Sequence, residues 1–204
     1  MPLLTAEIYE LLQTKNLMLV FDTNVITQRG FMPLCQQVQR INLIRTKPQI
    51  KLYVPAVAHA EHLFHLAQQY GDSYNLEFIR ENLVIHEIEI LNFTQQEAEY
   101  CAKLLQQKYN TPPEWQAAKK RRCLECVGLP DDYSLAAGTG GQCGAPNDWL
   151  IMAQAQHGNM ILVTEDKGKH QEFSLVLNVA RYNNLKESLN RILTELTNLH
   201  QTNV

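Results

Sequence analysis

Four carboxylates stand at positions where a folded chain could gather them at one site. They are Asp22, Glu61, Asp148 and Asp166. Clustered carboxylates repel one another unless a cation neutralises them, and Mg²⁺ or Mn²⁺ prefers such oxygen ligands. Two such ions about 4 Å apart can activate a water and stabilise the leaving oxygen during in-line attack on phosphorus. The residue types therefore predict a divalent-metal site suited to phosphodiester chemistry.

Two of these carboxylates follow apolar runs that read as buried strands. Asp22 comes directly after residues 17–21, and Asp166 comes shortly after residues 160–163. A short, continuous apolar run is typical of a strand in a parallel sheet, where helices cover both faces. Ligands of such sheets gather outside the carboxyl ends of the strands. We therefore expect both aspartates at the same edge.

The other two carboxylates lie on predicted helices beside those strand ends. Glu61 belongs to a helix over residues 56–70, in which Ala60, Leu63, Phe64 and Ala67 follow a helical spacing. This stripe predicts a core-facing side, and Glu61 would lie close to it, where an unpaired carboxylate is costly. Asp148 opens a helix over residues 146–157.

Strands and helices alternate along most of the chain, which predicts an α/β fold with a mostly parallel central sheet and helices on both faces. The expected strands are 17–21, 51–55, 84–91, 160–163 and 175–179. The expected helices are 5–14, 33–46, 56–70, 73–81, 94–109, 146–157 and 184–199.

Residues 110–145 interrupt this alternation. They contain adjacent prolines, a basic run and a glycine-rich stretch. We interpret them as an insertion in a single domain that spans residues 1–204, with a core over about 17–180.

Composition limits the classes of protein that remain. The net charge of −3 provides no global basic field, which counts against a pure nucleic-acid-binding module. No apolar run approaches the roughly 18 residues of a membrane span, and Glu7 and Glu10 stand where a signal peptide would be basic. The odd number of cysteines, five, does not fit a disulfide framework. We expect a cytoplasmic protein without membrane contact.

The chain resembles the PIN-domain nucleases in four motifs that occur in the same order. The first is Val20-Phe21-Asp22-Thr23-Asn24-Val25-Ile26, and the second is Val57-Ala58-His59-Ala60-Glu61. The third is the stretch from Asn147 to Ala155, and the fourth is Leu162-Val163-Thr164-Glu165-Asp166-Lys167. The resemblance covers about residues 17–180 and is nearest to the VapC-like toxins.

The resemblance implies a PIN-like three-layer sandwich and a Mg²⁺-dependent endoribonuclease. By this likeness Asp22, Glu61, Asp148 and Asp166 are the catalytic metal ligands. Asn24 and Thr164 would orient the carboxylates, and Glu165 would assist. The same likeness implies a toxin of a type II toxin–antitoxin pair, with RNA as substrate, a small antitoxin as partner and a homodimer as assembly.

Basic side chains could contact the RNA backbone. The candidates are Lys167 and Lys169 beside Asp166, and the run Lys119, Lys120, Arg121 and Arg122. A solvated helix face is the alternative for the run. Cys123, Cys126 and Cys143 could bind zinc, although free thiols are the default because no fourth ligand is evident.

Other functions remain as alternatives. A non-toxin RNA-processing PIN nuclease and a non-catalytic RNA-binding or interaction module of the same fold would share most of these features. Loss of a carboxylate would be expected in the non-catalytic module, and the set is intact. A phosphatase of the haloacid dehalogenase type requires a second aspartate where this chain has Asn24.

Overall fold

The structure is a computed structural model. It describes residues 2–108, 111, 113–114, 116–117, 120–121, 130, 147–165 and 178–202. The expected insertion at 110–145 lies largely outside these residues.

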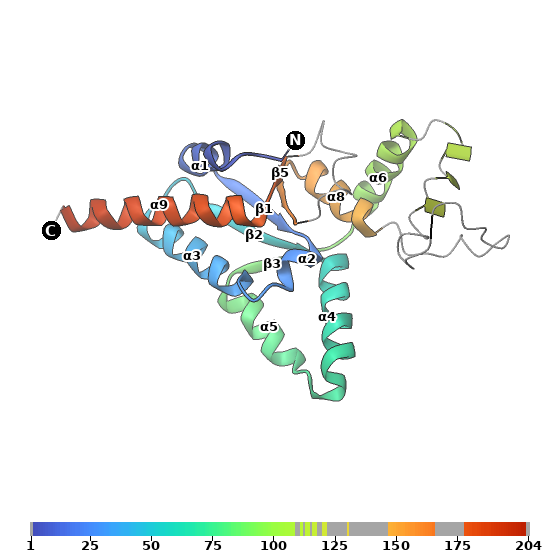
Figure 1. Ribbon diagram of the computed structural model, residues 1–204, viewed down its shortest axis with the longest axis horizontal. Helices are drawn as coiled ribbons and strands as arrows, with labels where there is room; N and C mark the ends of the chain where they lie inside the picture. The colour runs from blue at the N-terminus through green and yellow to red at the C-terminus, as the bar shows by residue number, and fades with distance from the viewer. Residues whose placement is uncertain are drawn as a thin grey trace.

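A five-stranded sheet forms the centre of the molecule (Figure 1). Its strands are β1 (Leu17–Phe21), β2 (Ile50–Pro55), β3 (Ile88–Leu91), β4 (Ile161–Val163) and β5 (Val179–Ala180). The order is β3-β2-β1-β4-β5, and every neighbouring pair is parallel. Four of the five residues of β1 are buried, as its continuous apolar run predicts.

Helices flank this sheet, and they are α1 (Thr5–Thr14), α2 (Thr23–Ile26), α3 (Phe31–Ile44), α4 (Ala56–Tyr70), α5 (Leu76–Ile85), α6 (Gln95–Lys108), α8 (Asn147–His157) and α9 (Tyr182–Thr202). A short 3₁₀ turn, η1 (Gly71–Ser73), joins α4 to α5. The predicted α/β fold with a parallel central sheet flanked by helices is confirmed.

The first and the last helix of the described chain, α1 and α9, pack together on one side of the core. Helix α1 packs along α9, and α9 also packs on α3 (Figure 1). Ile8 and Leu12 of α1 and Leu185 and Leu189 of α9 are almost fully buried. These contacts join segments about 180 residues apart in sequence, as the hydrogen bond from Ser188 Oγ to Thr5 O also does.

The expected strand at 84–91 is wrong in its first half. Val84 and Ile85 end α5, and the strand begins only at Ile88. Glu87 between them has a positive φ of 53°, which breaks the chain direction between helix and strand. Alternating apolar residues predict a strand here, but Val84 and Ile85 are 77% and 63% exposed and contribute to no sheet face.

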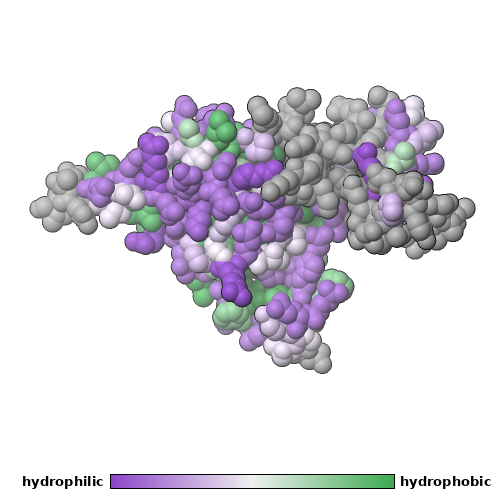
Figure 2. Space-filling model, in the orientation of Figure 1, coloured by the Kyte–Doolittle hydropathy of each residue, from purple (hydrophilic) through white to green (hydrophobic). Residues whose placement is uncertain are grey.

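Helix α4 does not bury the side that its sequence pattern predicts. Ala60 and Phe64 are exposed, the latter at 63%, and Ala58 is the buried residue of the helix. Figure 1 shows the reason: α4 leaves the sheet at its first turns and extends beyond it to meet α5 at η1. Figure 2 shows a largely hydrophilic face on which hydrophobic atoms gather in the lower part of the molecule, around α5.

In the ranges that the structure describes, no helix is both long and apolar enough to cross a membrane.

Candidate functional site

Asp22 lies at the point where the strand order of the sheet reverses. The chain passes from β1 outward to β2 and β3, and then returns to place β4 on the other side of β1. In open α/β sheets, ligands bind outside the carboxyl ends of the strands at such a reversal. Phe21 pairs with Val163, so the residues that follow, Asp22 and Thr164, leave the sheet side by side.

Three donors fix the Asp22 carboxylate. Oδ1 accepts from the Thr23 backbone N–H at 2.8 Å. Oδ2 accepts from Asn24 Nδ2 at 2.8 Å and from the Thr164 hydroxyl at 2.7 Å. The residue is 5% exposed and also serves as the N-cap of the short helix α2. A buried carboxylate with both oxygens held in this way has a defined direction before any ligand binds.

Asn24 connects the ends of β1 and β4. Besides donating to Asp22, its Nδ2 lies 3.1 Å from the Thr164 hydroxyl, and its Oδ1 accepts from the Glu165 backbone N–H at 3.0 Å. The side chain of Glu165 faces another direction, since its Oε1 accepts from Asn183 N–H at the start of α9, at 3.4 Å. Asn24 and Thr164 therefore contact Asp22 directly, whereas the backbone of Glu165 contacts Asn24.

Glu61 is brought to the same site by α4. Its Oε1 accepts from Asn147 Nδ2 at 2.7 Å, and its Oε2 accepts a short hydrogen bond from the Thr23 hydroxyl. Glu61 is partly buried but has polar partners on both oxygens, in place of the apolar surroundings that the sequence pattern predicts. Thr23 and Asn147 thus link Glu61 to its neighbours on α2 and α8.

Asp148, in the first turn of α8, lines one open pocket together with Asp22 and Glu61. The cavity has a volume of about 1060 Å³ and continues along α4 as far as Tyr70. Its remaining walls carry one leucine, Leu66, and otherwise polar and aromatic side chains, namely Thr23, Asn24, Thr27, Arg29, His62, Phe64, His65, Gln69, Tyr70 and Asn147. We call this cavity the acidic groove.

The donor set of the acidic groove has the chemistry of a hard-cation site, because its three carboxylates offer only oxygen ligands. Within the described ranges, however, no three His, Cys, Asp or Glu side chains are close enough to hold a metal ion. The hydrogen bonds from Thr23 and Asn147 engage both oxygens of Glu61. The fourth predicted ligand, Asp166, lies outside the described residues.

Two histidines of α4 near Glu61 favour the neutral form. Burial lowers the pKa of His59. The pKa of His62 is lowered by burial first and then by repulsion from His59 and His65. His62 lines the acidic groove and therefore adds a neutral imidazole to it near pH 7.

The predicted RNA-contacting residues are only partly described. Lys120 and Arg121 are exposed on a helical segment. The others, Lys119, Arg122, Lys167 and Lys169, lie outside the described residues, as do Cys123, Cys126 and Cys143. Cys35 and Cys101, the cysteines that are described, are buried free thiols.

Several groove residues were not singled out by the sequence. Thr23 and Asn147 each adjoin a predicted carboxylate in the chain, and this adjacency was the available signal. His62, His65 and Gln69 share one helical face with Glu61. The spacing of His62 and His65 from Glu61 matches no metal-binding motif, so the sequence did not indicate them.

Comparison with known proteins gives structural likeness only. No family model matches the sequence, and no curated protein matches it. The crystal structure of VapBC2 from Rickettsia felis, bound to a DNA fragment from their promoter, aligns with a TM-score of 0.40 and 18% identity. The alignment covers 81% of this chain and 99% of that one. VapBC-1 from nontypeable Haemophilus influenzae aligns with a TM-score of 0.42 and 19% identity, over 82% and 99% of the two chains.

Proposed function

We propose that this chain is a metal-dependent endoribonuclease of the PIN type, acting as the toxin of a toxin–antitoxin pair. One observation supports this most: the buried, three-fold hydrogen-bonded Asp22 carboxylate at the reversal point of the sheet, facing a groove shared with Glu61 and Asp148. A carboxylate with that placement is what a phosphodiester-cleaving metal site requires.

In this proposal Asp22, Glu61 and Asp148, with Asp166, would hold Mg²⁺ or Mn²⁺, for which Glu61 would give up its hydrogen bonds to Thr23 and Asn147. The cation would supply charge neutralisation and an activated water. Asn24 and Thr164 keep the Asp22 carboxylate pointing in one direction. The neutral imidazole of His62 stands beside the groove as a hydrogen-bonding group for the substrate.

The substrate we propose is unpaired RNA. From Glu61 to Tyr70 the helix rises about 13 Å, and along it Phe64 and Tyr70 are 63% and 51% exposed. Exposed aromatic rings in a groove stack on unpaired bases, which a duplex does not offer. Arg29 adds a cationic group for the phosphates.

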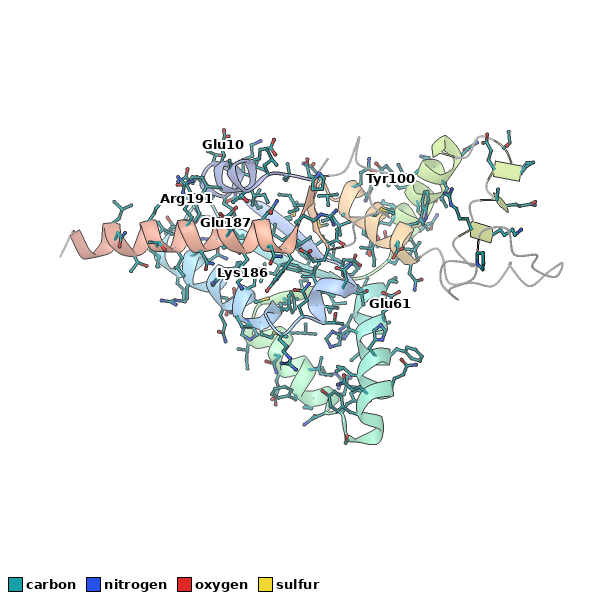
Figure 3. The ribbon with its side chains drawn as sticks, in the orientation of Figure 1. Glu10, Glu61, Tyr100, Lys186, Glu187 and Arg191 are labelled. Carbon is teal, nitrogen blue, oxygen red and sulfur yellow. The ribbon has the colours of Figure 1, made fainter. Side chains whose placement is uncertain are left out.

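The decisive test is cleavage of single-stranded RNA by wild-type protein and by Asp22→Asn. We expect Mg²⁺-dependent cleavage by the wild type, loss in EDTA, recovery with Mn²⁺ and only background cleavage by Asp22→Asn. Glu10→Gln is the matched control, because it removes one carboxylate charge on α1, far from Glu61 (Figure 3). Full activity of a correctly folded Asp22→Asn would remove the proposed mechanism.

A small antitoxin is the partner that completes the proposal. Helix α5 has no buried residue, and Phe78, Val84 and Ile85 are exposed at 61%, 77% and 63%. Apolar surface of this kind typically marks a protein-binding face. Expression of the wild type should arrest growth, Asp22→Asn should not, and co-expression of the product of a small adjacent gene should restore growth. Growth unaffected by an active enzyme would favour the RNA-processing alternative.

A further inference from the structure

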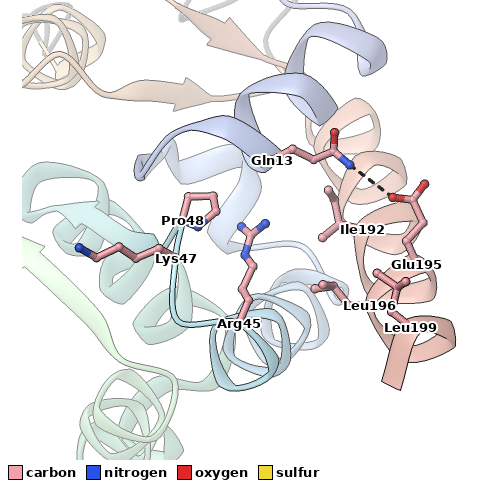
Figure 4. A pocket seen from close by; sticks show the side chains of 8 residues that line it. All are labelled: Gln13, Arg45, Lys47, Pro48, Ile192, Glu195, Leu196 and Leu199. Carbon is pink, nitrogen blue, oxygen red and sulfur yellow. Dashed lines mark hydrogen bonds between the residues drawn. The ribbon is translucent and has the colours of Figure 1, made fainter. Parts of the chain in front are cut away.

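A second cavity lies on another side of the molecule and shares no residue with the acidic groove. It is enclosed by α1, α9 and the loop between α3 and β2, and its volume is about 360 Å³ (Figure 4). Ligand pockets typically begin near this size. Its lining consists of Gln13, Arg45, Lys47, Pro48, Ile192, Glu195, Leu196 and Leu199. We call it the α1–α9 pocket.

Arg45 is the unusual group of this pocket. Its guanidinium points toward Gln13 in the space between Pro48 and Ile192, whereas Lys47 extends away from it (Figure 4). The Nε and Nη2 atoms are buried and have no hydrogen-bond partner among the residues that the structure describes. Burial also lowers the pKa of Arg45. Arg45 is partly buried as a whole, but a shielded donor without an acceptor costs free energy, so these two nitrogens favour a ligand that supplies acceptor oxygens.

The one carboxylate of the pocket is already engaged. Glu195 accepts from the Tyr9 hydroxyl, from Gln13 Nε2 at 3.4 Å and from Arg191 Nε at 3.2 Å. The hydrogen bond from Tyr9 lowers the pKa of Glu195 most, and Arg191 lowers it further. Arg191 is held in turn over the ring of Tyr9, with its Cζ 3.9 Å from the ring centroid. Glu195 is therefore neutralised by Arg191 and forms no ion pair with Arg45.

Apart from Gln13 and Lys47, the rest of the pocket lining is apolar. Pro48, Ile192, Leu196 and Leu199 offer aliphatic surface, and Leu199 is 61% exposed at the end of α9. The two unpaired nitrogens are the donors of one edge of the guanidinium fork, which matches the two oxygens of a carboxylate. We infer that the α1–α9 pocket binds a small aliphatic carboxylate, with its head on Arg45 and its chain on α9. Since both nitrogens are shielded, the guanidinium must turn toward the cavity as the ligand enters.

Three probe molecules distinguish the contribution of the carboxylate head from that of the aliphatic chain. The full-length protein is titrated with hexanoate, with hexanol and with acetate, and backbone amide signals of residues 45–48 and 192–199 are followed by NMR. Hexanoate should bind saturably and at least about tenfold more tightly than either other probe. If hexanol binds as tightly as hexanoate, Arg45 does not recognise a carboxylate. If acetate binds as tightly as hexanoate, the aliphatic wall does not contribute to binding. No saturable shift with hexanoate would overturn the proposal outright.

Variants then assign the head group. Arg45→Gln should reduce hexanoate affinity about tenfold, to the level of hexanol. Arg45→Lys retains the charge but not the planar guanidinium, so it should retain only part of the wild-type hexanoate affinity. Arg40→Gln is the matched control, since it removes the same charge from α3 at a residue that lines a different cavity. Unchanged hexanoate binding in folded Arg45→Gln would refute the assignment.

Discussion

At the scale of single residues, the direction of Asp22 depends on side chains that follow two different strands, Asn24 after β1 and Thr164 after β4. The sequence indicated Asp22 because a buried strand ends directly before it. It indicated Thr164 only through the family resemblance. Thr164 and Asp22 are 142 residues apart in sequence, and no local sequence pattern can predict so distant a contact. The hydrogen bonds from Thr23 and Asn147 to Glu61 had no signal beyond chain adjacency.

Thr164→Val removes the hydroxyl that donates to Asp22 and nearly preserves the volume of the side chain. We expect cleavage to fall about 10- to 100-fold, the usual effect of losing a group that orients a metal ligand. The free energy of unfolding should fall by about 1 kcal/mol. Thr194→Val is the control, because its hydroxyl bonds to the Asn190 carbonyl on α9. Both quantities are measured by RNA cleavage assay and urea unfolding; equal activity of the two variants would contradict the orienting role.

Arg45→Met should stabilise the empty protein. The change removes two shielded nitrogen donors that have no partner among the described residues, and it adds apolar contact with the aliphatic wall of the α1–α9 pocket. We expect the Tm to rise on the order of 2 °C, as measured by calorimetry. Arg40→Met, at an exposed position of α3, should change it little. A lower Tm for Arg45→Met would mean that the guanidinium has a stabilising contact.

At the scale of elements, strands were more predictable than helix faces. The strands β1, β2 and β4 follow apolar runs to within a residue, because burial between two helical layers demands such runs. The face of α4 was mispredicted, because periodicity shows which residues share a side but not whether anything covers that side. The four-residue helix α2 has no periodicity to detect, and its N-cap is Asp22 itself.

Helix α4 should make stability sensitive to acid. The pKa values of His59 and His62 are lowered in the folded state from 6.5, so below about that pH the unfolded chain binds more protons than the folded one. Stability is therefore fully present above pH 6.5 and falls as the pH decreases below it. In urea unfolding at a series of pH values, the double variant His59→Gln/His62→Gln should lose less stability on acidification. An equally steep decline in both proteins would contradict this origin.

At the scale of the whole molecule, the packing of α1 along α9 joins distant parts of the chain. Leu189→Ala removes a fully buried side chain from α9 and should lower the free energy of unfolding by about 2–5 kcal/mol. Leu199→Ala makes the same change on the same helix at a 61% exposed position and should cost far less. Urea unfolding measures both, and similar losses would mean that α9 is not fixed to the core as described.

The hydrogen bond between Thr164 and Asp22 also has a consequence during protein synthesis. When β1 leaves the ribosome, β4 has yet to be translated, and the hydroxyl that orients Asp22 does not yet exist. Domains generally fold as units during synthesis, and this single sheet is incomplete until β4 has been made. A ribosome-bound nascent chain that ends before β4 therefore presents Asp22 without its Thr164 donor, and the complete constellation arises only late in translation.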